Sequence, residues 1–281
     1  MEDIKVIYVH LDFFKYSFSH KLAECPHVYK GLPDYANTSI HQSEKYFKEV
    51  IVLDSSYYKS EVEDFYKLCE SKYQNFSKDP FWFFTLARLL VLFKYVSDNS
   101  IKRFIHMEYD NLLYSDGSCF DELEDGVYFT QVGPSVGSAG FMYCNSHSRA
   151  ELFLDSLVSL INQGQVFLAN ELRTGHLYEM EMIDYLKTKG FCDYLPLFPE
   201  DEHYNTCKKV FDGASYGQYL AGTNNGHDKG WFGTHHHVGK KLSEKSINIL
   251  FDYKPYLIQD DHKIEIFNLH LHNKKLIQEF V

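Results

Sequence analysis

The chain has 281 residues and a formal net charge of -11. Its composition, 44% hydrophobic and 24% charged, is that of a folded globular protein and excludes global disorder. So acidic a chain is a poor electrostatic partner for nucleic acid or for an anionic membrane surface, and no stripe of lysine and arginine offsets this charge.

The N-terminus and the cysteines indicate a cytoplasmic protein. The first residues, MEDIKVIYVHLDFFKY, lack the positive start and long apolar run of a signal peptide, and we interpret them as a first strand. The most apolar segment, 81–96, contains Arg88 and Lys94 and is too short and too charged to span a membrane. Six scattered cysteines without a CxxC pair fit free thiols in a reducing compartment. The oligomeric state is left open.

The first two-thirds of the chain alternates expected strands with expected helices. Short runs of β-branched and aromatic residues predict strands, and apolar residues at every third or fourth position predict helices. The expected strands are 5–11, 50–53, 103–107, 128–132 and 138–144, and the expected helices are 60–73, 80–93, 149–161 and 171–189. Asp79 is expected to cap the helix that Pro80 opens, a helix apolar nearly all round and therefore buried. This alternation predicts an α/β fold whose mostly parallel sheet is covered by helices on both faces.

The last third of the chain is less regular. It contains a stretch rich in glycine, asparagine and histidine, GTNNGHDKGWFGTHHHVGKK, followed by the short expected strands NILFDY and KIEIFNLHLH. Within the stretch, His235, His236 and His237 are adjacent, so along a strand their side chains would alternate and could not converge on one ion. We expect a single domain, 1–281, with a C-terminal appendage on the same sheet.

Two acids with one residue between them follow the expected strand 103–107. Glu108 and Asp110 stand where ligands bind in open α/β sheets, beyond the carboxyl end of a strand. Two converging carboxylates repel each other unless a cation lies between them, and oxygen ligands suit Mg²⁺ or Mn²⁺. The alternative is a pair of solvated acids in a loop, but the apolar residues on both sides of the pair disfavour its solvation. We therefore expect a divalent metal here.

The last expected strand supplies candidate partners for that metal. Period-2 alternation places one set of side chains on one face, which turns from apolar to polar along the strand: Ile264, Ile266, Asn268, His270 and His272. His270 or His272 could give a neutral imidazole to the metal, with His270 slightly favoured, and Lys274 and Lys275 could neutralise phosphate. The alternative is an exposed polar face on an edge strand.

Four pieces in this order resemble the GT-A-fold glycosyltransferases. Glu108-Tyr109-Asp110, within IHMEYDNLLY, resembles their DXD motif, although its first acid is Glu rather than Asp. Ala87-Arg88-Leu89 is similar to the upstream segment that lends a polar residue to the donor. SAGFMYCNSHS resembles the small-residue strand on the acceptor side, and FNLHLHNKKL resembles the terminal strand, where a His reaches the metal and a Lys the diphosphate. The resemblance covers about residues 4–276.

The resemblance implies a metal-dependent transfer of sugar from a nucleotide-sugar, with a UDP-sugar favoured, to a glycan or other hydroxyl acceptor. About residues 1–165 would bind the donor, and about 166–281 would form the acceptor side and the terminal metal and phosphate strand. The metal, Mn²⁺ or Mg²⁺, would be held by Glu108 and Asp110 together with His270 or His272. The donor phosphates would contact Arg88, Glu108, Asp110, Lys274 and Lys275, and the sugar and acceptor would contact Ser138, Gly140, Gln218, Asn224 and Trp231.

The segment FDGASYGQYLAGTNN allows two interpretations, one structural and one catalytic. Asp212 can cap a helix through Tyr216 and Tyr219, and its glycines permit close approach of backbone or ligand. If the transfer inverts the sugar, Asp212 or Asp228 is the candidate base toward the acceptor hydroxyl. In the plain alternative, Asp212 is only a cap and Trp231 only a loop anchor.

Two other functions are alternatives to a glycosyltransferase. A non-catalytic glycan-binding protein on the same fold could use the acid pair for a structural ion. A nucleotidyltransferase would normally carry a glycine-rich N-terminal loop with basic residues, which KVIYVHLDFFKY lacks.

Overall fold

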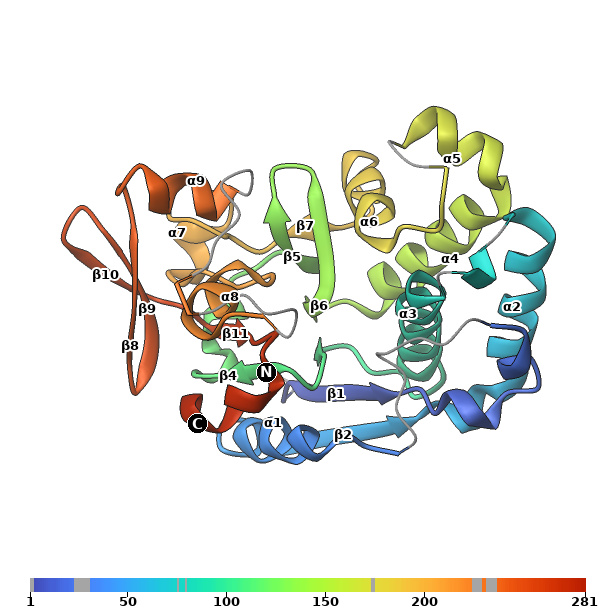
Figure 1. Ribbon diagram of the computed structural model, residues 1–281, viewed down its shortest axis with the longest axis horizontal. Helices are drawn as coiled ribbons and strands as arrows, with labels where there is room; N and C mark the ends of the chain where they lie inside the picture. The colour runs from blue at the N-terminus through green and yellow to red at the C-terminus, as the bar shows by residue number, and fades with distance from the viewer. Residues whose placement is uncertain are drawn as a thin grey trace.

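The computed structural model of the chain describes residues 3–22, 31–74, 76–78, 80–172, 175–223, 229–230 and 237–281. Within them, a six-stranded sheet in the order β2–β1–β3–β6–β5–β7 forms the centre of the molecule (Figure 1). Its strands are β1 (Lys5–His10), β2 (Glu49–Asp54), β3 (Phe104–Met107), β5 (Val127–Gly133), β6 (Val136–Cys144) and β7 (Asp193–Tyr194). Only β6 runs against its neighbours in this sheet, so the predicted mostly parallel α/β sheet is confirmed.

Apolar side chains in succession build the inner strands of this sheet, as β1 shows. Ile7 and Val9 belong to the hydrophobic cluster on one face of the sheet. Val6 and Tyr8 belong to the cluster on the other face. A strand buried on both faces requires apolar residues at nearly every position, which is why KVIYVH lacks the alternation of a half-exposed strand.

Helices flank the sheet (Figure 1). The α-helices in the described part of the chain are α1 (Asp34–Glu44), α2 (Lys59–Lys72), α3 (Phe81–Asp98), α4 (His147–Gln163), α5 (Gln165–Glu171), α6 (Glu179–Thr188), α7 (Tyr204–Cys207), α8 (Ser215–Ala221) and α9 (His237–Ser243). Side chains of α2, α3, α4 and α6 share the cluster on one face. The opposite face packs against the end of α1 and against buried aromatics from later segments, among them Phe120, Phe211 and Phe267.

Several expected helix bounds change in the structure. The predicted helix 171–189 was wrong in its first half, because α5 ends at Glu171 and α6 begins only at Glu179. Pro80 occupies the N-cap position of α3 rather than its first turn, and Asp79 lies outside the described residues. The sequence did not predict α1, whose buried residues are mostly small and polar and so leave no apolar stripe, namely Ala36, Thr38, Ser39, Gln42 and Ser43.

The predicted C-terminal strand 263–272 is divided between two sheets, which corrects the expected appendage on the central sheet. β10 (His262–Glu265) completes an antiparallel sheet with β9 (Lys254–Gln259) and β8 (Asn248–Asp252), seen at the left of Figure 1. β11 (Asn268–His270) pairs instead with β4 (Asn111–Leu113). Leu269 and Leu271 lie in the same hydrophobic cluster as Ile264 and Ile266, although the expected alternation places them on opposite faces. The alternation expected over 263–272 therefore breaks between Ile266 and Leu269.

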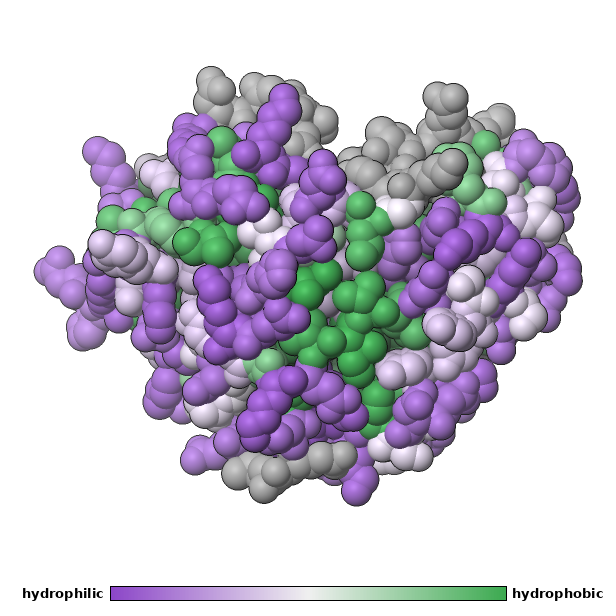
Figure 2. Space-filling view, turned by 90° about the horizontal axis from the view of Figure 1, so that it is seen from below, coloured by the Kyte–Doolittle hydropathy of each residue, from purple (hydrophilic) through white to green (hydrophobic). Residues whose placement is uncertain are grey.

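β2 is the outer strand of the central sheet, on the side from which Figure 2 is seen. Hydrophobic surface occupies the middle of that face and hydrophilic side chains border it (Figure 2). Val50 and Ile51 are half-buried, and Val52 is 38% exposed.

No single helix among the described residues combines the length and the apolar character needed to cross a membrane. α4 and α5 reach both only when they are counted together, and the chain bends by 105° between them.

Candidate metal centre and its cavity

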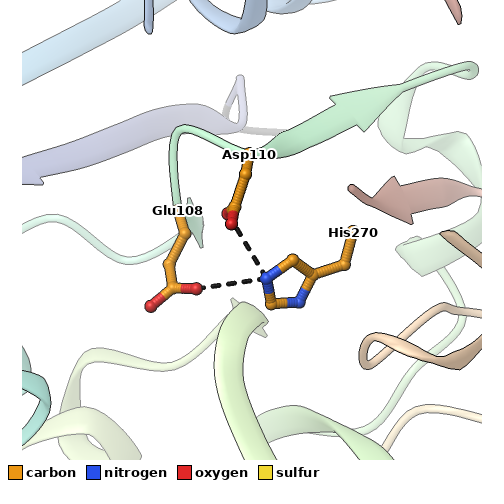
Figure 3. Close-up of side chains that lie close together, drawn as sticks. All are labelled: Glu108, Asp110 and His270. Carbon is orange, nitrogen blue, oxygen red and sulfur yellow. Dashed lines mark ion pairs between the residues drawn. The ribbon is translucent and has the colours of Figure 1, made fainter. Parts of the chain in front are cut away.

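The acid pair stands in a tight turn between β3 and β4. The N–H of Glu108 donates to the carbonyl of Gly140 at 2.9 Å, and the N–H of Asn111 donates to the carbonyl of Glu108 at 3.0 Å. This turn aims both carboxylates toward the imidazole of His270, which comes from β11 (Figure 3). His270 Nε2 lies 3.3 Å from Glu108 Oε2 and 3.3 Å from Asp110 Oδ1.

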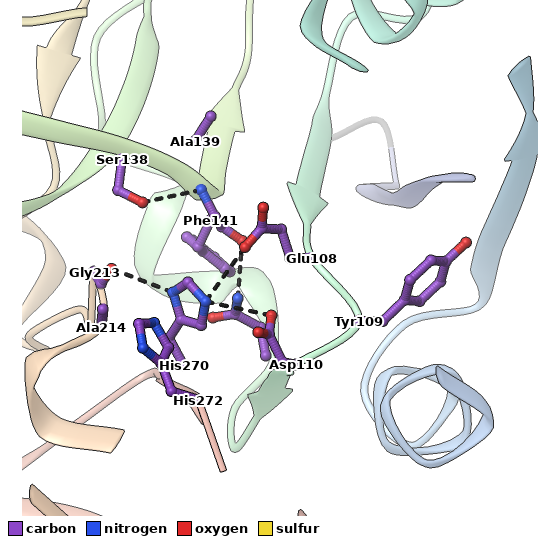
Figure 4. Close-up of polar contacts among 12 residues, drawn as sticks. Glu108, Tyr109, Asp110, Ser138, Ala139, Phe141, Gly213, Ala214, His270 and His272 are labelled. Carbon is purple, nitrogen blue, oxygen red and sulfur yellow. Dashed lines mark hydrogen bonds and ion pairs between the residues drawn. The ribbon is translucent and has the colours of Figure 1, made fainter. Parts of the chain in front are cut away.

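The tautomer of His270 suits a metal ligand. Its Nδ1 lies 3.2 Å from the carbonyl oxygen of Gly213 (Figure 4). A carbonyl can only accept a hydrogen bond, so Nδ1 carries a hydrogen, and in the neutral ring the Nε2 lone pair is available to a cation between the two carboxylates. Burial alone would lower the pKa of His270, but Glu108 and Asp212 raise it above its ordinary value.

These three side chains fit a divalent cation. One ligand atom from each of Glu108, Asp110 and His270 lies within 4.8 Å of the others. Asp110 is only 7% exposed, and its Oδ1 is buried without a hydrogen-bond partner among the described residues. A buried carboxylate oxygen without a partner is costly, and a cation at this point would satisfy it. Two carboxylates and one imidazole suit Mn²⁺ well, and the carboxylates also suit Mg²⁺.

Two basic side chains stand on either side of the acids. Arg88 on α3 approaches Glu108 Oε1 with its Nη2 at 2.5 Å, and Lys274 bonds to Asp110 Oδ2. Burial would raise the pKa of Glu108, but Arg88, His270 and Lys274 hold it well below its usual range. Burial lowers the pKa of Lys274 to about 8, against the opposing effect of Glu108. The centre thus combines a cation site with positive charge on two sides, as a diphosphate would require.

Small residues let the neighbouring segments approach His270. A Cβ added to Gly140 would lie 2.7 Å from Cε1 of the His270 ring, and one added to Gly217 would overlap the His270 carbonyl group. β6 and α8 therefore reach β11 only because both positions are glycine. The glycines of the segment FDGASYGQYLAGTNN predicted a close approach of backbone or ligand. This is confirmed at Gly217, which lies against the backbone of His270.

Asp212 supports the centre from behind. Its carboxylate is fully buried and accepts backbone N–H groups of Ala214, Tyr216, Gly217 and His270 at 2.7–2.9 Å. It thereby fixes the first turn of α8 and the backbone of His270. Burial raises the pKa of Asp212, although these N–H groups oppose the rise. Because its oxygens are already occupied, this geometry favours the cap reading over a base toward substrate.

A cavity of about 520 Å³ opens in front of the centre. Nine of the residues expected at the site line it: Arg88, Glu108, Asp110, Ser138, Gly140, Gln218, His270, His272 and Lys274. His272 lies beside the His270 ring, and its Nδ1 is 2.9 Å from Gln218 Nε2, so this nitrogen is directed at Gln218 and not at the acids (Figure 4).

Other expected site residues are not brought to the cavity. Within the part of the chain that the structure describes, Asp212 and Lys275 do not line it. The Lys275 side chain is exposed, because the turn that brings Lys274 inward directs the next residue outward. Asn224, Asp228, Trp231, His235 and His236 lie outside the described residues. His237 begins α9, so strand alternation does not apply to it.

One carboxyl group of the cavity was not predicted from the sequence. Glu179, the first residue of α6, is 4% exposed, lines the cavity and accepts the N–H of Ala139 at 2.9 Å. Burial raises its pKa to about 7, against the lowering effect of Arg88. Such a group can exchange a proton near neutral pH. An acid in the first turn of a helix is a recognisable signal, but the helix was expected to begin eight residues earlier, which hid it.

The sequence also did not predict that aromatic side chains of α3 line the cavity. Phe81, Trp82 and Phe84 line the cavity. In the sequence they belong to a helix that is apolar nearly all round, and in such a helix periodicity does not distinguish a residue facing the core from one facing a cavity.

No protein-family model matches the chain, and a comparison with curated proteins finds no match. Among solved structures, the chain is similar to mouse xyloside xylosyltransferase 1 in its apo form, with a TM-score of 0.39 and 10% identity over 68% of this chain and 84% of that one. It is also similar to the glycosyltransferase GlyE of Streptococcus pneumoniae TIGR4 in its apo form, with a TM-score of 0.34 and 11% identity over 69% of this chain and 45% of that one. Likenesses this distant carry no argument about chemistry, which depends on the geometry described above.

Proposed function

We propose that this protein is a metal-dependent glycosyltransferase that moves a sugar from a nucleotide-sugar, with a UDP-sugar favoured, to a hydroxyl of a glycan or other acceptor. The observation that carries the proposal is the Glu108–Asp110–His270 centre, set between Arg88 and Lys274 at the carboxyl edge of the sheet. A cation site flanked by two basic groups suits a diphosphate, and the cavity in front of it has room for a sugar.

Each residue has a stated role in this proposal. Glu108, Asp110 and His270 would hold Mn²⁺ or Mg²⁺, which when bound neutralises charge on the diphosphate. Arg88 and Lys274 add fixed positive charge beside the same group. Ser138, Gly140 and Gln218 would contact the sugar and acceptor, together with Asn224 and Trp231.

The transfer exchanges one bond for another. The bond between the sugar and the diphosphate breaks, the nucleoside diphosphate leaves with the bonding electron pair, and the acceptor oxygen forms the new glycosidic bond. The acceptor proton must then be removed. Of the acidic side chains that line the described cavity, Glu179 stands apart from the metal centre, so we assign the base to it in an inverting transfer. In a retaining transfer the same carboxyl would orient the sugar. Asp212 and Asp228 are the other candidates for this base, although the backbone N–H groups around Asp212 favour a structural role for it.

The test is release of nucleoside diphosphate from a panel of UDP-, GDP- and dTDP-sugars, and of nucleoside monophosphate from a CMP-sugar, with and without Mn²⁺. Replacing a metal ligand should lower activity at least as much as replacing the residues that support the ligand. Asp110→Ala is therefore expected to lower nucleotide release and sugar transfer by about 10²-fold or more. Circular dichroism and the unfolding midpoint should show an intact fold.

Asp155→Ala, which removes an exposed acid on α4, is the matched control and should keep full activity. Turnover at the wild-type rate in Asp110→Ala would contradict the proposal. Release of pyrophosphate instead would indicate nucleotidyl transfer. Binding of sugars without any release would indicate the glycan-binding alternative.

A further inference from the structure

One side of the cavity is built from large apolar side chains that the metal centre does not use. We call Phe81, Trp82, Phe84 and Met180 the apolar wall, since all four line the cavity and all four are half-buried. The Trp82 ring contacts two others, with ring centroids 4.3 Å from Tyr178 and 4.8 Å from Phe81 at nearly perpendicular angles. Its orientation is therefore fixed before any ligand binds.

The apolar wall lies at a distance from the charged end of the cavity. Trp82 precedes Arg88 by six residues on α3, so it stands about 9 Å further along the helix axis. Arg88 in turn contacts Glu108 of the metal centre. A donor diphosphate at the metal centre leaves the space between Arg88 and Trp82 for the sugars that react.

The charges of the cavity point to an uncharged occupant at the apolar wall. Of the arginine and lysine side chains that line its described part, Arg88 and Lys274, each bonds an acid of the metal centre. The carboxyl beside the apolar wall is Glu179, which precedes Met180 on α6 and accepts a hydrogen bond from the Ala139 N–H. A phosphate-bearing acceptor would meet this carboxyl without a free cation to balance it.

We propose that the apolar wall is the acceptor subsite and takes an uncharged sugar ring, whose apolar face packs on Trp82 while its hydroxyl groups bond to Glu179. A purely apolar alcohol would leave the buried Glu179 carboxyl facing carbon, which is costly, whereas a sugar satisfies both the ring and the carboxyl. The inference rests on the proposed function. It places the acceptor ring at the start of α3.

The experiment measures transfer from whichever donor of the panel releases its nucleotide. The acceptor probes are methyl glycosides of glucose, galactose, xylose and N-acetylglucosamine, with glucose 6-phosphate and 1-octanol as the charged and the apolar alternative. Wild-type protein is expected to use a methyl glycoside. Trp82→Ala should raise KM for it about tenfold or more, the effect of losing a central aromatic contact, and Trp82→Phe should restore most of the loss.

Two controls separate the failure of this inference from the failure of the proposed function. Binding of UDP with Mn²⁺, measured by calorimetry, should be the same in Trp82→Ala as in wild type, because Trp82 belongs neither to the metal centre nor to its flanking charges. Tyr253→Ala removes an aromatic ring that is 93% exposed and outside the cavity, and should leave KM unchanged.

If the wild type releases the nucleotide but Trp82→Ala keeps its KM, the acceptor subsite is elsewhere and the inference is overturned. Transfer only to 1-octanol or only to glucose 6-phosphate, or to none of the probes, would overturn it as well. If the wild type neither binds a nucleotide with Mn²⁺ nor releases one from any donor, the proposed function itself fails.

Discussion

At the scale of single residues, three carboxyl groups at and around the site have three different surroundings. Glu108 is held ionised by Arg88 and His270, and Asp212 is surrounded by backbone N–H groups. Glu179 has an Ala139 N–H on one oxygen, and its burial raises the pKa to about 7. All three are acids in the sequence, and the raised pKa of Glu179 lets it exchange a proton near neutral pH.

Glu179→Gln should therefore change how stability depends on pH. The folded state raises the pKa of Glu179 from 4.5 to about 7, so it binds that proton more tightly than the unfolded chain does. The contribution of the protonated group to stability is complete below about pH 4.5 and is lost as the pH rises through about 7. From pH 4 to pH 8, the free energy of unfolding of the wild type should fall by on the order of 3 kcal/mol relative to that of Glu179→Gln. Urea unfolding of both proteins across this range measures it, and a constant difference would contradict the assignment.

At the scale of elements, a buried hydrogen-bond network joins β11 to β4 and to the start of α8. The side-chain amide of Asn268 donates to Asn111 Oδ1 at 2.8 Å and to the carbonyl of Asp212 at 2.9 Å, and it accepts the Asp212 N–H at 3.2 Å. Asn111 in turn donates to the carbonyl of Gly140 on β6 at 2.9 Å. The network sets the place from which His270 reaches the acid pair two residues further along β11.

Asn268→Leu should test this network. The substitution keeps a similar volume but leaves buried partners without a hydrogen bond, and each such group costs about 1–3 kcal/mol. We expect the free energy of unfolding to fall by about 3 kcal/mol or more, and Mn²⁺ to bind more weakly, because His270 loses its support. Urea unfolding and a calorimetric titration with Mn²⁺ measure the two effects.

Asn162→Leu is the matched control, since Asn162 is exposed on α4 and bonds only its own helix in the part described. Such surface changes usually alter stability by within about 0.5 kcal/mol. Equal stability of the two variants would show that the Asn268 network does not hold the elements together.

At the scale of the whole molecule, the site exists only when distant segments meet at one edge of the sheet. The metal centre takes residues from the β3–β4 turn and from β11, while α3 and the segment after β11 supply its flanking charges. The acid pair and His270 are separated by about 160 residues of chain. Anything that binds this assembled site but not the unfolded chain must stabilise the fold.

Mn²⁺ with UDP should therefore raise the unfolding midpoint. Ligands at about a hundred times their dissociation constant contribute about 2.7 kcal/mol, which is expected to shift the midpoint of a chain of this size by several degrees. EDTA should reverse the shift, and Asp110→Ala should abolish it. Thermal unfolding followed by circular dichroism measures all three. An unchanged midpoint in wild type with both ligands present would argue against a nucleotide site.

The sequence by itself determined the central strands, most of the helices and the acid pair at the end of the third strand. These features are local, because periodicity and strand ends follow from the backbone geometry of each segment. It also supplied His270 as a candidate metal ligand and favoured it only slightly over His272.

The tertiary structure alone decided which polar groups are desolvated and which partners they meet. Packing split the strand expected over 263–272, occupied the oxygens of Asp212, and brought Glu179 and Trp82 to the cavity. The physical reason is that the state of a buried polar group depends on contacts across a hundred or more residues, and no local pattern in the chain records them.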